Sequence, residues 1–340
     1  MPTTRTKSAF AILPDESRKH LVKEAQPTWL PPMLATLTDR RFSDPGWLFE
    51  RKIDGYRCVT YRHGSSLRLM SRNRNVLNED YPEVVAALEA QRPTDYIIDG
   101  EVTAFEGKAS SFSALQRRDL LRGTRLRRPA KFRIVYVVFD LLYLDGYLTT
   151  RLPLTDRIAL LEHLFEWNEV LQRSVALPEE GRQYYARACK SGWEGLIAKR
   201  ADAPYVSARS NDWLKFKCTN RQEFVIGGFT APQGAREEFG ALLVGYYEGT
   251  KLIYAGKVGT GFSAALLRSL GRSLHELQVG KSPFVGGADL PKDAHWVKPR
   301  LVGEIAFTEW TPEGKLRHPA FQGLREDKPA SKVIRERPKP

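Results

Sequence analysis

The chain has 340 residues, of which 42% are hydrophobic and 27% charged, so it holds enough apolar side chains for packed cores and is not a mainly disordered protein. Its 53 Lys and Arg residues outnumber its 40 Asp and Glu residues, and the resulting formal charge of +13 favours a polyanionic partner. No stretch approaches the ~20 apolar residues of a spanning helix, and the charged start lacks the apolar run of a secretory signal, so we expect a cytoplasmic protein that does not bind membranes.

The first part of the chain divides into an irregular start and a region of alternating strand-like and helical runs. Residues 1–27 mix charged and small side chains without periodicity, so we expect a tail or a loosely docked arm there. Beyond it, alternation and apolar runs predict strands within 47–64 and 132–146, and helical spacing predicts helices within 79–91 and 154–168. These elements indicate a mixed α/β domain over residues 28–220.

The character of the sequence changes near Arg221. Short strand-like runs follow, joined by turns that contain glycine, and Glu248-Gly249 is a hairpin signal. Residues 263–277 have the spacing of a single helix. Several short strands and one helix are typical of a small five-stranded barrel that binds nucleic acid, so we expect a second domain over residues 221–340.

A series of short motifs carries the chemistry. The tetrapeptide Lys52-Ile53-Asp54-Gly55 is weak alone, because a KxDG pattern arises by chance in roughly one chain in ten of this length. It is followed, in order, by SRN at 71–73, DGE at 99–101, FDLL at 139–142, EGLIAKR at 194–200, WLKFK at 213–217 and REDK at 325–328.

This ordered set resembles the covalent nucleotidyltransferase superfamily of ATP-dependent DNA ligases, RNA ligases and mRNA capping enzymes. The resemblance covers about residues 28–333 and is closest to the ligase module of bacterial ligase D and its stand-alone relatives, through PPMLATL, GKVGTGF, EWTPEGKLRHPAF and LREDKPA. It implies an α+β fold of two domains, a mixed α/β nucleotidyltransferase domain (ATP-grasp-like, of the DNA ligase/mRNA capping type) followed by an OB-fold β-barrel.

The resemblance also implies roles for individual residues. Lys52 would carry AMP taken from ATP, Phe139 would stack on the adenine, and the ion would be Mg²⁺ or Mn²⁺ held by Glu101 and Glu194. The implied catalytic residues are Lys52, Asp54, Lys217, Arg325 and Lys328. The implied nucleotide-binding residues are Glu50, Lys52, Arg57, Arg72, Glu101, Phe139, Glu194, Arg209, Lys215 and Lys217.

The chemistry of a lysine nucleophile sets a physical requirement. A lysine amine must be neutral to attack phosphorus, yet with a reference pKa of about 10.4 only about one in 2,500 is neutral at pH 7. We expect nearby cations, from among Arg51, Arg57, Lys215 and Lys217, to lower the pKa of Lys52. Read alone, Lys52 and Arg51 would be solvated strand residues.

Two further patterns bear on binding. Residues 121–133 hold six basic side chains and no acid, which suits either a solvated loop or sequence-independent phosphate contacts, and the charge of the chain favours the contacts. The six histidines lack metal-ligand spacing. The three cysteines, Cys58, Cys189 and Cys218, lack CxxC spacing, so we expect reduced thiols and no disulfide framework or zinc ribbon.

These observations lead to one expected function and two alternatives. We expect an ATP-dependent DNA ligase, monomeric, that acts on nicked or broken duplex DNA in repair or end joining, with the end-binding protein Ku as a possible partner. An RNA ligase or GTP-using capping enzyme would share the motifs, and the attached nucleotide would distinguish it. A non-catalytic nucleic-acid-binding relative would attach no nucleotide.

Overall fold

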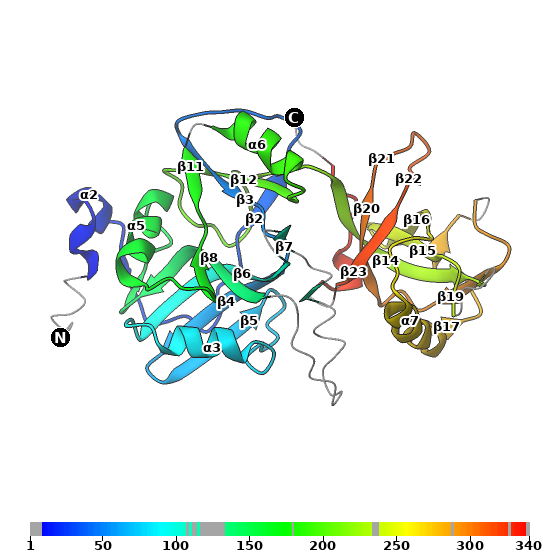
Figure 1. The fold of residues 1–340 in the computed structure, drawn as a ribbon, viewed down its shortest axis with the longest axis horizontal. Helices are drawn as coiled ribbons and strands as arrows, with labels where there is room; N and C mark the ends of the chain where they lie inside the picture. The colour runs from blue at the N-terminus through cyan, green and yellow to red at the C-terminus, as the bar shows by residue number, and fades with distance from the viewer. Residues whose placement is uncertain are drawn as a thin grey trace. The chain divides into compact units, whose positions relative to one another are not determined.

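The computed structural model describes residues 9–106, 109–110, 114–115, 133–178, 180–232, 238–286, 289–325 and 328–337. The chain divides into two compact units (Figure 1). Unit 1 extends to Cys218, and unit 2 is Thr219–Arg337. Except for Arg133, the basic stretch predicted to contact phosphates lies outside the described residues.

The larger sheet of unit 1 is built around two long strands, β6 and β8, which pair antiparallel. Helices α3 (Pro82–Glu89) and α5 (Leu154–Leu164) confirm the two predicted helices and pack their apolar sides on one face of this sheet. The strand order is β1-β9-β8-β6-β4-β5, with β10 beside β8 and β7 beside β6. The bounds are β1 Val22–Lys23, β4 Tyr56–His63, β5 Ser66–Ser71, β6 Asp95–Glu106, β7 Ala109–Ser110, β8 Arg133–Leu144, β9 Tyr147–Leu148 and β10 Leu171–Arg173.

A second sheet of unit 1 has the order β11-β3-β12-β13-β2. Helix α6 (Gly181–Lys190) packs on β3 and β12, as the upper part of unit 1 shows in Figure 1, through Phe49, Leu196 and Phe216. The opposite face of this sheet meets the larger sheet, where Trp213 packs in one cluster with Tyr61 and Tyr143. The bounds are β2 Leu34–Leu37, β3 Trp47–Arg51, β11 Ala176–Pro178, β12 Gly195–Arg200 and β13 Arg209–Lys217.

Residues 9–27 pack on unit 1, which corrects the expectation of a tail or loosely docked arm. Short helices at Phe10–Ile12 and Asp15–Arg18 precede β1, which pairs antiparallel with β9. Phe10 and Leu13 are buried in the main core, and the Phe10 ring meets the Tyr147 ring edge to face at 5.5 Å. These apolar side chains are too few and too irregularly spaced to show a periodicity in the sequence.

Unit 2 has an eight-stranded sheet, a separate two-stranded sheet of β21 and β22, and one long helix, α7 (Ala264–Glu276), which its sequence predicts. The hairpin signal is confirmed, because Glu248 pairs with Lys251 across a turn in which Gly249 has φ of +60°. The strand β14 (Asn220–Thr230) pairs with β15 on one edge and with β19 and β20 on the other. The remaining bounds are β15 Leu242–Glu248, β16 Lys251–Val258, β17 Gln278–Val279, β18 Phe284–Val285, β19 Ala294–Val297, β20 Val302–Phe307, β21 Glu309–Trp310, β22 Leu316–Arg317 and β23 Ala320–Leu324.

The sheet of unit 2 differs from the expected barrel. It contains eight strands, and in the described part of the chain no pairing joins its two edges. The extra strands β17, β18 and β19 are two to four residues long, which is too short for alternation to show in the sequence.

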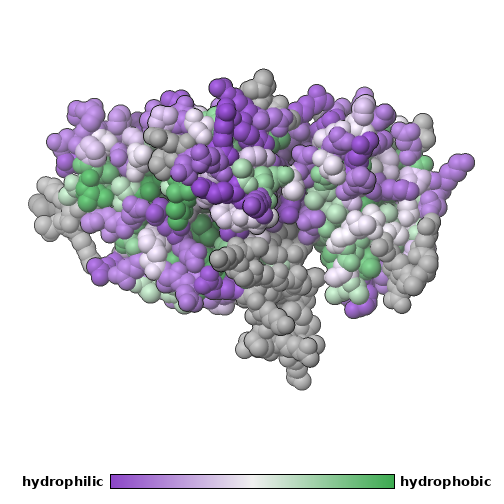
Figure 2. Space-filling model, turned by 45° about the horizontal axis from the view of Figure 1, so that its top comes forward, coloured by the Kyte–Doolittle hydropathy of each residue, from purple (hydrophilic) through white to green (hydrophobic). Residues whose placement is uncertain are grey.

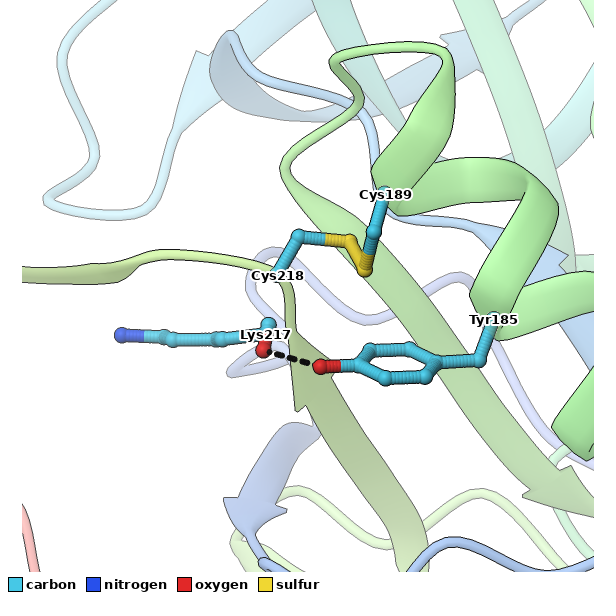
Figure 3. Close-up of a disulfide and its surroundings, with 4 residues drawn as sticks. All are labelled: Tyr185, Cys189, Lys217 and Cys218. Carbon is cyan, nitrogen blue, oxygen red and sulfur yellow. Dashed lines mark hydrogen bonds between the residues drawn. A yellow bond between two sulfur atoms is a disulfide. The ribbon is translucent and has the colours of Figure 1, made fainter.

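Cys189 and Cys218 form a disulfide, so the prediction of reduced thiols is wrong for these two residues. Cys189 lies on α6 and Cys218 directly follows β13, and their Cα atoms are 5.1 Å apart (Figure 3). Their sequence separation of 29 hides this proximity in the sequence. Cys58 is a buried free thiol, as predicted, and burial raises its pKa to about 12.

The surface agrees with the charge content of the chain. On the face seen in Figure 2, hydrophilic residues cover most of the described surface and hydrophobic residues form smaller areas between them. Within the described ranges, no helix is both long and apolar enough to cross a membrane.

Candidate active site

One face of the β3-β12-β13 sheet carries charged side chains in register. Glu50 lies opposite Ile197, and Ile197 lies opposite Lys215 on the next strand. Because side chains alternate along a strand, Lys217 shares this face with Lys215, while Phe216 points to the other face and packs under α6. The strand period thus separates an apolar layer from a layer of functional groups.

Lys52 directly follows β3 and is fixed by both backbone and side chain. Its N–H donates to the Gly195 carbonyl at 2.9 Å, and its Nζ lies 2.5 Å from Glu194 Oε2. The side chains of Lys52 and Glu194 are only 23% and 5% exposed. They therefore form a largely buried ion pair between two segments that are 142 positions apart.

The pKa of Lys52 is raised, which contradicts the expectation that nearby cations would lower it. Burial lowers the pKa of Lys52, but attraction to Glu194, Glu101 and Asp54 outweighs it, so the pKa is raised above its ordinary value. Arg51 points to the opposite face of β3, where its guanidinium lies 4.3 Å from the centre of the Trp193 ring. In this state, acids surround the amine.

Two glycines allow the segments around Lys52 to approach closely. A Cβ on Gly55 would lie 2.2 Å from the Val102 carbonyl oxygen, beside Glu101. A Cβ on Gly195 would lie 1.9 Å from the Phe216 oxygen, and Gly195 also has φ of +151°. Only glycine fits these two positions. Because Gly55 directly follows Asp54 and Gly195 directly follows Glu194, the close approach at each glycine also fixes the position of the acid before it.

Phe139 sits at an irregularity of the larger sheet. Asp99 pairs with Asp140 and Gly100 with Val138, so Phe139 is the extra residue of a β-bulge. It is half-buried within a strand that is otherwise buried from Ile134 to Leu144. The bulge turns its ring to the side where the Arg57 guanidinium and Lys199 Nζ lie 4.6 and 4.4 Å from the ring centre.

The cations beside Phe139 are each held by a buried carboxylate. Arg57 donates to both oxygens of Asp99, at 2.6 and 2.5 Å, and this attraction, which outweighs burial, raises the pKa of Arg57. The Tyr205 hydroxyl also donates to Asp99, at 2.5 Å. Lys199 Nζ lies 2.9 Å from Glu50, which accepts a further bond from Ser174.

Sequence reasoning assigned no role to Asp99, Lys199, Tyr205 or Trp213. Asp99, Lys199 and Trp213 belong to the quoted motifs DGE, EGLIAKR and WLKFK, so a signal existed for them. Trp213 contacts the Phe139 ring edge to face at 6.0 Å, and Lys199 Nζ lies 4.4 Å from its ring. Tyr205 lies in no motif, and no pattern in the sequence marks it.

The remaining candidates are distributed as follows. Glu101 lies opposite Arg57 in the β4–β6 register. The Lys217 carbonyl accepts a hydrogen bond from the Tyr185 hydroxyl at 2.9 Å, and the Lys217 side chain extends away from that ring (Figure 3). Arg209 begins β13 and donates to the Ala35 carbonyl, and Arg72 lies half-buried in the turn after β5.

Arg325 and Lys328 belong to unit 2. Each is paired within that unit, Arg325 with Glu304 at 2.9 Å and Lys328 with Glu223 at 3.2 Å. The structure thus groups Lys52, Asp54, Glu101 and Glu194 together, and groups Glu50, Arg57 and Phe139 around Lys199 and Asp99.

The acids around Lys52 fit a divalent cation held jointly with a substrate. Carboxylate oxygens suit Mg²⁺, which usually takes one or two of them together with phosphate oxygens and water. Among the described residues, no three or more His, Cys, Asp or Glu side chains form a complete metal site by themselves. Glu194, directly before β12, and Glu101, on β6, both act on Lys52 and match such a shared site.

Comparisons with known proteins agree on one family. The family model described as "ATP dependent DNA ligase domain" matches residues 32–217, and "ATP dependent DNA ligase C terminal region" matches residues 235–328. The chain is 39% identical over 324 residues to "Multifunctional non-homologous end joining protein LigD" of Pseudomonas aeruginosa, covering 93% of this chain and 38% of that protein. It is 39% identical over 317 residues to its Mycobacterium tuberculosis counterpart, covering 90% and 40%.

A solved structure also matches over nearly its full length. The structure described as "mycobacterial DNA ligase D complexed with ATP and MES" is 36% identical, with a TM-score of 0.66, and covers 90% of this chain and 98% of that one. The chain spans about two fifths of the length of the curated relatives it matches.

Proposed function

Since the chain belongs to the ATP-dependent DNA ligase family, we propose that it seals nicks between a 5′-phosphate and a 3′-hydroxyl in duplex DNA through AMP carried on Lys52. The expected fold class agrees with the order of the two family matches, a nucleotidyltransferase domain and then an OB-fold domain. The observation that carries the proposal is the placement of Lys52, at the end of β3 and against Glu194, beside the acids expected to share a metal ion with ATP.

The reaction consists of three exchanges at phosphorus. The Lys52 amine loses a proton and forms an N–P bond to the α-phosphate of ATP, while the bond from that phosphorus to pyrophosphate breaks. The 5′-phosphate of the nick then takes the AMP and frees the lysine. The 3′-hydroxyl finally attacks that 5′-phosphorus, loses its proton and releases AMP. Positioning and charge neutralisation carry most of the catalysis in such transfers.

The residues of unit 1 have separate tasks in this proposal. Phe139 provides the surface for adenine. The cations of Arg57 and Lys199, which lie over its ring, and the edge-to-face contact with Trp213 fix the orientation of that ring. Arg57, Arg72 and Arg209 bind ribose or phosphate, and Lys215 and Lys217 neutralise phosphate charge. A divalent cation held by Glu101 and Glu194 would supply further neutralisation.

Arg325 and Lys328 are proposed to act only on the first exchange. Negative charge develops on the departing pyrophosphate, and cations on that side of the α-phosphate stabilise it. Arg325→Ala or Lys328→Ala should therefore impair formation of lysyl-AMP and leave sealing of a pre-adenylylated nick much less affected. Comparable losses in both reactions would argue against this assignment.

The test of the proposed function is covalent labelling. Incubation with ATP labelled at the α-phosphate, followed by a denaturing gel, should label the wild-type chain and leave Lys52→Ala unlabelled. Lys190→Ala, which removes an exposed lysine from α6, is the matched control and should label normally. Label on Lys52→Ala would refute the nucleophile, and label from GTP in place of ATP would favour a capping enzyme.

End joining with Ku is a narrower part of the proposal, and it is supported by the likeness to the LigD proteins. We expect a monomer that joins nicked, cohesive and blunt duplexes, with Ku increasing the yield on broken ends. Ligation of these three substrates, with and without Ku, tests it. If Ku changed the ligation yield on none of the three substrates, the result would point to another repair route.

A further inference from the structure

Unit 2 contains a compact cluster of four charged side chains. Glu223 on β14 and Glu304 on β20 are direct partners in the antiparallel register of these strands. Two carboxylates in such a position repel each other, and burial makes an uncompensated charge more costly. Arg325 and Lys328 supply the compensation, through the contacts of 2.9 Å to Glu304 and 3.2 Å to Glu223.

The four groups act as one network. Burial alone would raise the pKa of Glu223, but Lys328 and Arg325 together lower it to about 2. Glu336, from the segment that follows Lys328, opposes this effect. Glu223 is therefore influenced by both cations, not only by the one in contact with it, and stays ionised at any pH at which the enzyme would work.

The backbone alone does not fix the charged ends of these cations. The Arg325 N–H donates to the Val302 carbonyl at 2.7 Å, directly after β23, and this bond sets where the side chain begins. Arginine and lysine side chains have many rotamers, and ordering each end costs up to about 2 kcal/mol of side-chain entropy. Here the Arg325 and Lys328 side chains are only 14% and 13% exposed, and the two carboxylates contact their charged ends.

We propose that Glu223 and Glu304 are positioning residues that orient Arg325 and Lys328 toward the pyrophosphate leaving group of ATP. This inference rests on the proposed ligase function and on the role proposed for the two cations. The glutamates themselves touch no reacting atom. Because a displacement of ~1 Å in a reacting geometry can cost ~10²-fold in rate, loss of either carboxylate reduces the first exchange without changing the nucleophile.

The experiment uses Glu223→Gln and Glu304→Gln, which remove charge and keep the size of the side chain. We expect each to lower the rate of lysyl-AMP formation by at least about tenfold and to weaken inhibition by added pyrophosphate by a similar factor. Sealing of a pre-adenylylated nick should change less than about twofold. Glu309→Gln, at an exposed ion pair with Arg317 in the same unit, is the matched control and should leave all three measurements unchanged.

Other outcomes overturn the inference. Equal losses in both reactions, with a lowered melting temperature and unchanged inhibition by pyrophosphate, would assign the glutamates a purely structural role. An unchanged first exchange would remove them from the reaction. Glu304→Asp and Glu223→Asp retain the charge and should recover most of the loss. If Glu304→Gln does not fold, the test relies on Glu223→Gln, because Glu223 is the less buried of the two glutamates. A wild-type chain that forms no lysyl-AMP would instead refute the proposed function.

Discussion

The Lys52 side chain is an ammonium ion in contact with Glu194, although a lysine must be neutral to attack phosphorus. Three acids act on it, and their attraction outweighs the effect of burial, so the free enzyme holds its nucleophile in the unreactive form. The same contact orders the lysine side chain before substrate arrives. Reaction must therefore draw on a small neutral fraction or on a charge that competes for Glu194.

The resulting prediction concerns pH. Because the pKa of Lys52 is raised, the neutral fraction of the amine increases about tenfold per pH unit throughout the range below that pKa. Single-turnover formation of lysyl-AMP at saturating ATP should therefore rise with pH between ~6 and ~9, with a log-log slope near one. Rapid quenching at a series of pH values measures it. A flat profile would mean that bound ATP and metal lower this pKa below ~6.

Single residues also show what the sequence could and could not predict. The motifs predicted roles for Lys52, Glu101, Glu194 and Phe139 through resemblance, because the order of motifs can be followed directly along the sequence. The direction of the pKa shift of Lys52 was predicted wrongly, because the shift depends on the ion pair with Glu194, which lies 142 positions away in the sequence. Asp99 was missed as the partner of Arg57 for the same reason, although both lie in or near quoted motifs.

Among the secondary-structure elements, the buried strand predicted within 132–146 is present as β8, and the three predicted helices are present as α3, α5 and α7. Hydrophobic periodicity shows such elements because each repeats over many residues. The bulge at Phe139 was not predicted, because one extra residue in a strand changes pairing without changing composition. The local feature that turns the aromatic ring was therefore invisible in the sequence.

The junction of β12 and β13 leads to a second prediction. Gly195→Ala places a Cβ 1.9 Å from the Phe216 oxygen, so the strands must separate and Glu194 must shift. We expect a loss of at least about 2 kcal/mol in unfolding free energy and a large fall in adduct formation. Urea denaturation and labelling measure these. Gly192→Ala is the control, because Gly192 also has a positive φ, of +70°, yet nothing lies within 4 Å of the added carbon.

Should Gly192→Ala and Gly195→Ala lose the same stability, the backbone conformation would be the cause and the close approach would not matter.

For the molecule as a whole, the charge cluster in unit 2 links stability to pH. The pKa of Glu223 lies at about 2, below its ordinary value near 4.5, so its contribution is complete above pH ~4.5 and is lost as pH falls toward 2. This group should cost unit 2 up to about 3 kcal/mol over that range. Denaturant titrations at several pH values between 5 and 2 give the unfolding free energy at each pH. This free energy should fall less steeply with pH for Glu223→Gln than for wild type. Identical slopes would contradict the ion pair with Lys328.

The organisation of the whole chain was partly predictable. The change of character near Arg221 lies close to the point where the chain divides into two compact units, between Cys218 and Thr219. The docking of residues 9–27 and the disulfide were not predicted, because each depends on which segments the completed fold brings together.

The Cys189–Cys218 bond has a consequence for a chain that has been cut. Both β12 and β13, with Glu194, Lys215 and Lys217, lie within the loop that this bond closes. Residues 206–208, between the two strands, are exposed. A specific protease site inserted there should yield one band on a gel without reductant and two bands after reduction, whereas Cys189→Ser should give two bands in either case. If the cleaved protein that retains both cysteines gave two bands without reductant, the disulfide would be contradicted. In its oxidised form, this half of the site does not depend on an unbroken backbone for its continuity.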